Sequence, residues 1–198
     1  MGHSYGWRKR RDGVLVLSLA NPNPGVAMKR FTDSLRSSVN HGDWYVALST
    51  ALTLPDVCGR LIDPNMKSGP RYAAWFNTWM EPRYSFYSTH IGHVQMLGGD
   101  DCYALRCSYL HQGEGDTTGQ KASKALESFH FVEPPPDGGK IHCNKINNTL
   151  QLQVDIFCTD MADAVDRWAD SVAADAGIQL RMKKLLVIHK FNSGVIVL

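Results

Sequence analysis

The sequence predicts a mainly α-helical protein with an added β-hairpin and a C-terminal helix. Three observations lead to this fold class. Apolar residues recur at helical spacing in several segments from residue 28 onward, a strict alternation of apolar and polar residues occupies residues 140–158, and a last helical stripe surrounds Trp168. The chain has 198 residues and is 43% hydrophobic, which is enough for one packed domain and excludes a disordered chain.

Two helices are predicted in the first part of the domain. The first follows from Phe31, Leu35 and Val39, which are spaced four residues apart. The second follows from a stripe of Trp44, Leu48, Ala51 and Leu52, with Asp43 as its N-cap. Pro55 is expected to end or kink this second helix, and Gly59 is expected to close the turn that follows.

Residues that typically start or end helices define the limits of the next segments. Ser68-Gly69-Pro70 opens a third segment, Pro82 stops it, and its aromatic residues are expected to lie in the core: Tyr72, Trp75, Phe76 and Trp79. Residues 84–99 are rich in Ser, His and Gly and are predicted to form a loop. A short helix then begins at Asp100 or Asp101 and ends at Gln112-Gly113, because carboxylates favour helix starts and glycine favours helix ends.

The spacing of apolar residues then changes from a helical period to the two-residue period of a strand. Leu150, Leu152, Val154 and Ile156 alternate with polar residues, and Asn147-Asn148 is a turn signal, so residues 140–158 are predicted to form a β-hairpin. Thr159 is expected to cap the last clear helix, which Gly177 ends. Its apolar stripe consists of Met161, Val165, Trp168 and Val172. Residues 28–190 are therefore treated as one domain, and residues 191–198 as a tail.

Charge is distributed unevenly along the chain. Residues 1–36 have a net charge of +5, residues 37–180 of −7 and residues 181–198 of +4, although the whole chain has a net charge of only +2. Arg8, Lys9, Arg10 and Arg11 lie in a basic and apolar N-terminal extension, residues 1–27. They are either an RNA-contacting arm or a solvated tail. The apolar run that follows also loosely resembles a signal peptide, although Asp12 interrupts it.

The remaining composition favours a cytoplasmic protein with no membrane partner. Five cysteines without regular spacing indicate a reducing compartment, and no apolar run is long enough for a transmembrane helix. No cofactor is predicted, since phosphate-binding glycine motifs and nucleophile elbows are absent from the sequence. No metal is predicted either, because His90 and His93 lack companion ligands and are interpreted as surface histidines.

Arg106 and His111 are the candidate catalytic residues. Five positions apart on a helix, they are separated by about 140° around the axis and about 7.5 Å along it, so they do not share a face. A long arginine and a histidine at the helix end can nevertheless reach one phosphate. A neutral histidine can take a proton from a ribose 2′-hydroxyl, and a guanidinium can stabilise the charge that develops on the phosphate. Such a site needs no metal.

The segment from Asp101 to Gly113, with Arg106 and His111 in it, resembles the Arg-x4-6-His signature of the HEPN superfamily (higher eukaryotes and prokaryotes nucleotide-binding domains). The resemblance implies a HEPN-like helical bundle. It implies a homodimer in which Arg106 and His111 form a metal-independent endoribonuclease site that cleaves RNA by 2′-hydroxyl attack. It also implies a role in toxin–antitoxin or phage-defence systems, with an antitoxin or defence protein as a further partner. Cys107 departs from the pattern, since a polar residue commonly follows the arginine.

Four neighbours of the motif are candidate supporting residues. Asp100 and Asp101 either orient Arg106 or cap the helix, and Ser108 and Tyr109 either bind phosphate or pack. Two other functions remain open at this point. The chain is either a non-catalytic HEPN-like module that binds nucleotide, RNA or protein, or an unrelated helical scaffold in which Arg106 and His111 are structural.

Overall fold

The computed structural model describes residues 6–9, 15–18, 24–120 and 123–188, and it is mainly helical. The helices are α1 (Pro24–His41), α2 (Trp44–Ile62), α3 (Ser68–Trp79), α4 (Gly99–Gln112), α5 (Val154–Ser171) and α6 (Ala176–Met182), with a 3-10 turn at Glu81–Arg83. The strands are β1 (Gly6–Lys9), β2 (Leu15–Ser18), β3 (Ser85–Ser88), β4 (Gly92–Gln95), β5 (Ser128–Val132), β6 (Asn144–Ile146) and β7 (Thr149–Gln153).

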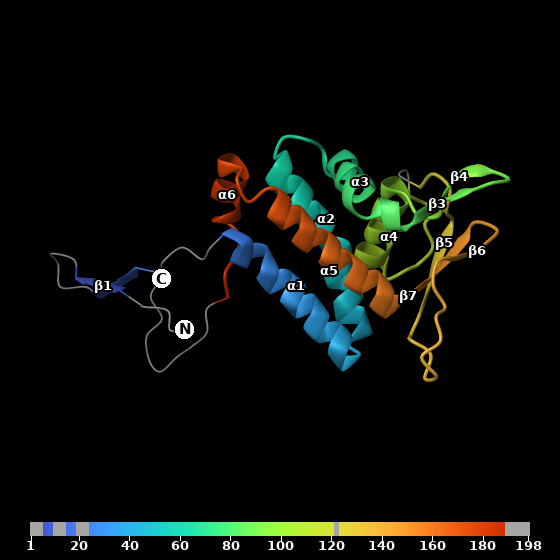
Figure 1. The fold of residues 1–198 in the computed structure, drawn as a ribbon, viewed down its shortest axis with the longest axis horizontal. Helices are drawn as coiled ribbons and strands as arrows, with labels where there is room; N and C mark the ends of the chain where they lie inside the picture. Colours follow the sequence, from blue (N-terminus) through green and yellow to red (C-terminus); the bar gives the residue numbers. More distant parts are fainter. Residues whose placement is uncertain (1–5, 10–14, 19–23, 121–122, 189–198) are drawn as a thin grey trace.

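The core lies among the three long helices. α1, α2 and α5 run side by side, and α3 and α4 pack on α2 (Figure 1). Leu35 of α1, Leu52 of α2 and Trp168 of α5 are almost fully buried between them. Tyr72, Trp75 and Phe76 of α3 are also buried, so the predicted aromatic core is confirmed for these three, whereas Trp79 is only partly buried.

The first two helices are present, but their limits differ from the prediction. α1 begins at Pro24, before the predicted start at Met28, because proline is well suited to the first helical position. α2 continues through Pro55 to Ile62, so Pro55 does not end the helix as the first of the two predicted outcomes had it, and Gly59 lies inside the helix and does not close a turn. Burial of Leu54, Cys58 and Leu61 on the same helix outweighs the cost of one missing N–H donor.

Residues 84–99 are not the predicted loop. β3 and β4 form an antiparallel hairpin in which Phe86 pairs with Val94 and Tyr87 with His93. Gly92 adopts φ 76°, a left-handed conformation that closes the connection at little cost. The hairpin extends beyond the helical body (Figure 1), and Phe86 and Tyr87 are exposed.

The predicted hairpin at 140–158 is present but shorter. β6 and β7 pair around Asn147, which has φ 54°, and β5 adds to β7 in parallel. α5 begins at Val154, so the prediction that Thr159 caps it was wrong: Val154, Phe157, Cys158 and Met161 already follow helical spacing and are buried. α5 ends at Ser171. Gly177 does not end it but lies in α6, whose start is capped by the Asp175 carboxylate.

Among the described residues, no helix is both long and apolar enough to span a bilayer. Arg10 and Arg11 and the tail 191–198 lie outside the described residues, and Arg8 and Lys9 are described only as backbone of β1.

Candidate active site on α4

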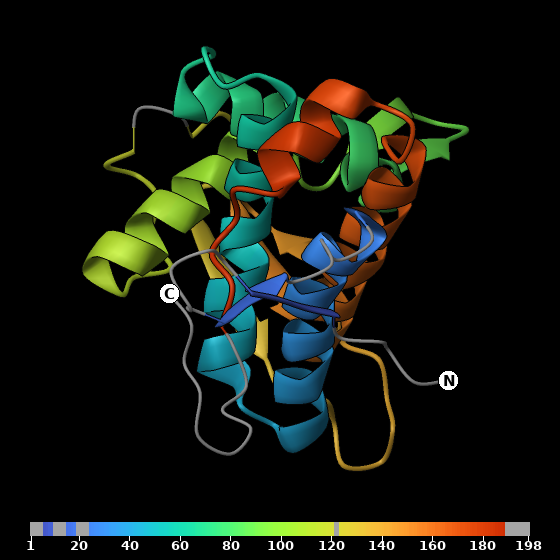
Figure 2. The same cartoon turned by 90° about the vertical axis from the view of Figure 1, so that its left-hand side faces the viewer.

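Arg106 and His111 meet near the C-terminal end of α4. Arg106 Nη1 lies 3.4 Å from His111 Nε2, although the two residues start from different faces of the helix. The length of the arginine side chain closes the gap. α4 ends at Gln112 and is followed by Gly113, the predicted C-terminal glycine, which has φ 75° and is the C-cap. Figure 2 shows α4, in yellow-green, extending outward from the bundle, and His111 is exposed.

A carboxylate of α2 fixes Arg106. Asp56 Oδ2 lies 3.0 Å from Arg106 Nε, and Asp56 Oδ1 lies 3.8 Å from a terminal nitrogen of Arg71 on α3. The side chains of Asp56, Arg71 and Arg106 are 13%, 15% and 22% exposed. Both carboxylate oxygens are buried and neither receives a well-directed hydrogen bond, so charge attraction holds the three groups together.

Asp56 and Arg71 are not among the site residues predicted from the sequence. One signal was present: Asp56 is a charged residue within the apolar stripe of α2, and such a residue usually needs a partner. Its partners come from α3 and α4, so only the packing of three helices reveals the cluster.

Tyrosine hydroxyls attach α4 to its neighbours. Tyr109 donates to the backbone oxygen of Tyr45 at the start of α2, with an O···O distance of 3.3 Å. The hydroxyl of Tyr103 lies 2.9 Å from that of Ser68 at the start of α3. Both tyrosines also pack on the core. These contacts hold the helix that presents Arg106 and His111, and they give Tyr109 a packing role.

A buried thiol lies beneath the cluster. Cys102 Sγ is 3.4 Å from the hydroxyl of Tyr72, and burial raises the pKa of Cys102 to about 12. Burial also raises the pKa of Tyr72. Both groups are therefore protonated at neutral pH, and Cys102 is an inert packing thiol. The cysteines in the described part of the chain are all free.

Asp101 and Ser108 contact the chain that follows α4, at residues 124–126 and at Asp116. Asp101 Oδ1 accepts backbone N–H groups of Lys124, Ala125 and Leu126 at 2.7, 3.0 and 3.3 Å. Ser108 is fully buried and donates to the backbone oxygen of Asp116. Asp100 lies beside Asp101 in the first turn of α4, whose N-cap position is occupied by Gly98. Asp101 therefore anchors a loop, and it neither caps α4 nor orients Arg106.

Replacing Asp101 with alanine is expected to lower the free energy of unfolding by about 3 kcal/mol, because it leaves three buried or half-buried N–H groups without their charged acceptor. The urea midpoint should fall with an unchanged slope. Asp100→Ala is the matched control and is expected to cost less than about 1 kcal/mol. Equal losses in the two variants would contradict the anchoring role.

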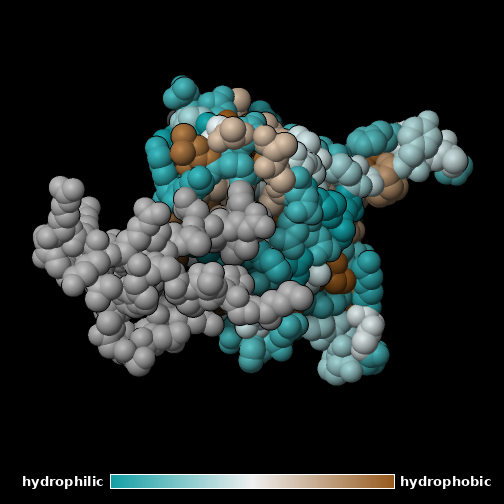
Figure 3. Space-filling view, turned by 60° about the vertical axis from the view of Figure 1, so that its left-hand side comes forward, coloured by the Kyte–Doolittle hydropathy of each residue, from teal (hydrophilic) through white to brown (hydrophobic). Residues whose placement is uncertain are grey.

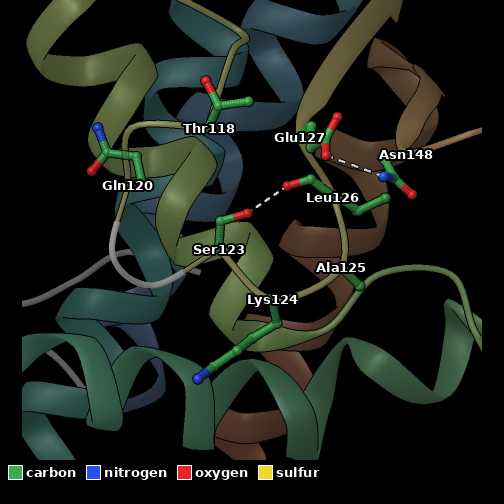
Figure 4. A pocket seen from close by; sticks show the side chains of 8 residues that line it. All are labelled: Thr118, Gln120, Ser123, Lys124, Ala125, Leu126, Glu127 and Asn148. Carbon is green, nitrogen blue, oxygen red and sulfur yellow. Dashed lines mark hydrogen bonds between the residues drawn. The ribbon is translucent and has the colours of Figure 1, made fainter.

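A separate pocket of about 280 Å³ lies on this loop and contains none of the predicted site residues. Its polar wall includes Ser123, which donates to the backbone oxygen of Leu126, and Asn148, which donates to Glu127 (Figure 4). The Lys124 amino group points away from the other labelled side chains. The neighbouring polar groups satisfy one another, so this pocket is not assigned a ligand.

The two histidines considered as metal ligands lie on the β3–β4 hairpin. His90 is exposed in its turn, and His93 Nε2 lies 3.9 Å from Glu81 Oε1. In the described ranges, no three His, Cys, Asp or Glu side chains are grouped to hold a metal ion.

Comparisons of the chain with protein-family models, with curated proteins and with solved structures found no match.

Proposed function

We propose that this protein is a HEPN-like, metal-independent endoribonuclease that acts as a homodimer, in a toxin–antitoxin or phage-defence system. The observation that carries the proposal is the convergence of Arg106 and His111 at the exposed end of α4. Arginine can only donate hydrogen bonds, so a hydrogen bond at this contact needs the neutral tautomer of His111 in which Nε2 is the acceptor. A histidine in that state can act as a base.

The reaction follows from these two groups. His111 removes the proton of a ribose 2′-hydroxyl, and the 2′ oxygen attacks the adjacent phosphorus. The bond from phosphorus to the 5′ oxygen breaks, and His111 of the second copy, in its protonated form, supplies the proton to that leaving oxygen. Arg106 donates to the phosphate oxygens as negative charge develops on them. The products are a 2′,3′-cyclic phosphate and a 5′-hydroxyl, with no net consumption of water.

The pairing of Arg106 with Asp56 supports this assignment, because it holds the guanidinium before the substrate arrives. The same pairing favours a second candidate, a non-catalytic HEPN-like module that binds RNA, nucleotide or protein. In that case Arg106 is engaged by Asp56 and contributes charge alone. Cys107, where the family commonly has a polar residue, also favours this second candidate.

The test is cleavage of a single-stranded RNA of mixed sequence by the purified full chain in excess EDTA. The proposal expects cleavage with 2′,3′-cyclic phosphate and 5′-hydroxyl ends. It also expects no cleavage at a linkage where the attacking ribose is 2′-deoxy. RNA that is bound but stays intact would support the second candidate instead. Cleavage that needs a divalent cation, or that leaves 5′-phosphate ends, would exclude the proposed reaction.

A further inference from the structure

A second pocket lies where α2 and α6 end. It has a volume of about 290 Å³ and is lined by Arg60, Leu61, Pro64, Arg181, Lys184 and Leu185. Three of these residues are apolar and three are cationic, and no acidic residue is among them. Such a lining suits a ligand that combines a flat apolar group with an anion. Figure 3, which turns the α6 end forward, shows a mainly hydrophilic surface with small hydrophobic patches.

Two of the cations are held in place by backbone oxygens at the end of α2. Arg181 Nε donates to the oxygen of Leu61 at 2.6 Å, and Arg181 Nη2 donates to that of Ile62 at 3.3 Å. Arg60 donates to the oxygen of Pro64. A guanidinium has five N–H donors, so both arginines retain donors for an anion. Lys183 and Lys184 follow Arg181 closely in the sequence and are exposed, and each carries its charge on a flexible side chain.

Helix α2 links this pocket to the candidate active site. Arg60 follows Asp56 by four residues on α2, so the two lie one turn apart on the same face. Asp56 in turn contacts Arg71 and Arg106. Arg60 thus connects the cations of the pocket with those around Asp56, and we call the whole group the cationic strip: Arg60, Arg71, Arg106, Arg181, Lys183 and Lys184.

The carboxylates within or beside the strip are occupied, and they include Asp175, which accepts the backbone N–H group of Ile178 at the start of α6. Asp56 is buried between two arginines, and Asp63 accepts the backbone N–H groups of Asn65 and Met66 at 2.8 and 3.1 Å. The strip takes Arg60, Arg71 and Arg106 from residues 37–180, a stretch of the sequence whose net charge is −7. The basic C-terminal end of the chain contributes Arg181, Lys183 and Lys184 to it.

We propose that the cationic strip binds the phosphate backbone of single-stranded RNA on one side of the cleaved bond, and that the α2–α6 pocket holds one nucleotide of that strand. The inference rests on the proposed function for the placement of the cleaved bond. Its chemistry is independent of that function: phosphates pair with the arginines and lysines, and a base or ribose covers Leu61, Pro64 and Leu185. The binding is tolerant of sequence, because backbone contacts carry no base information.

The test compares two double variants in binding a fluorescent, single-stranded 2′-O-methyl RNA, which cannot react by 2′-hydroxyl attack. Lys183→Gln with Lys184→Gln removes two charges from the strip without placing a carboxylate at the end of α6. Lys140→Gln with Lys145→Gln removes two charges near β6, at the opposite end of the molecule (Figure 1). Each variant lowers the net charge by two, so the two proteins have equal net charge, and thermal unfolding checks that both keep the fold.

The strip variant is expected to raise the dissociation constant about tenfold at low salt. It should also make the slope of log K against log salt less negative by about 1.4, which corresponds to two lost phosphate contacts on a single strand. The control variant should bind like the wild type. Three results would contradict the proposal that the cationic strip binds RNA. They are equal effects of the two variants, no effect of the strip variant, and a wild type that does not bind the RNA.

The RNA-binding test of the cationic strip and the cleavage test of the proposed function can fail independently of each other. A protein that binds through the strip and leaves ordinary RNA intact would contradict the proposed endoribonuclease and support the strip. A protein that cleaves RNA with unchanged binding in the strip variant would contradict the strip and support the endoribonuclease.

Discussion

His111→Ala is expected to lower the rate of RNA cleavage about 10³-fold, the size of effect that follows loss of a general acid or base. His111 is exposed, and its side chain contacts Arg106. The substitution therefore leaves the core intact, and the melting temperature should change little. The measurement is the initial rate of cleavage in EDTA at saturating RNA, with the melting temperature as the check on folding.

The matched control is His41→Ala. His41 is also an exposed histidine at a helix end, and its Nδ1 lies 2.7 Å from the backbone oxygen of Ser37 in α1. This variant should cleave RNA at the wild-type rate. If His111→Ala retained more than about a tenth of the wild-type rate, His111 would be neither the base nor the acid.

Arg106→Ala should reduce cleavage about 10²- to 10³-fold, as expected when a group that stabilises the transition-state charge is removed. Arg106→Lys separates charge from geometry, since lysine keeps the charge but loses the planar fork. A low rate in both variants would indicate that the fork is required. Arg167→Ala, at an exposed arginine that donates to the backbone oxygen of Trp79, is the control.

Local signals explain which parts of the fold were predictable. Gly113 stops α4 by its own backbone chemistry, so that limit followed from the sequence, whereas α3 ends at Trp79 and Pro82 lies in the 3-10 turn that follows. Pro55 is the counterexample: the same local rule failed, because burial of the residues around it favours a continuous helix. The alternation of Leu150, Leu152, Val154 and Ile156 crosses the boundary between β7 and α5, so it extended the predicted strand too far.

The candidate site was predictable only where it lies on one helix. Arg106 and His111 belong to the same segment, and their contact depends on the length of one side chain. Asp56 lies on α2 and Arg71 on α3. They come close to Arg106 only because the three helices pack together, and the sequence pattern of one segment does not reveal that packing. Ser108 and Asp101 lie on α4 as well, but their side chains point to the loop 116–126, a direction set by the contacts of that loop.

Asp56→Asn is expected to lower the free energy of unfolding by about 2 kcal/mol. Breaking a buried ion pair from one side costs about 3–5 kcal/mol, and an exposed pair is worth less than about 1 kcal/mol. The three side chains here are mostly buried but retain some solvent contact, which places the cost between those limits. Asparagine keeps the shape of the side chain but leaves two guanidinium groups facing each other without a counter-charge.

Two controls distinguish charge pairing from packing. Asp43→Asn, at the exposed N-cap position of the same helix, makes no side-chain cap bond and should cost little. Adding Arg71→Met to Asp56→Asn removes one of the two unpaired cations and should restore part of the stability. A double variant less stable than the sum of the two single changes would contradict the pairing.

The same substitution separates positioning from binding in the proposed reaction. Without Asp56, Arg106 loses the carboxylate that holds it in place. We therefore expect kcat to fall about tenfold, because the guanidinium is no longer positioned for the phosphate before RNA binds. KM should fall or stay unchanged, because the cationic strip loses its one internal negative charge and attracts RNA more strongly. A purely structural role for Asp56 would lower the folded fraction and leave kcat per folded molecule unchanged. The split between kcat and KM, measured below the melting temperature of each variant, therefore decides whether Asp56 acts on the reaction through Arg106.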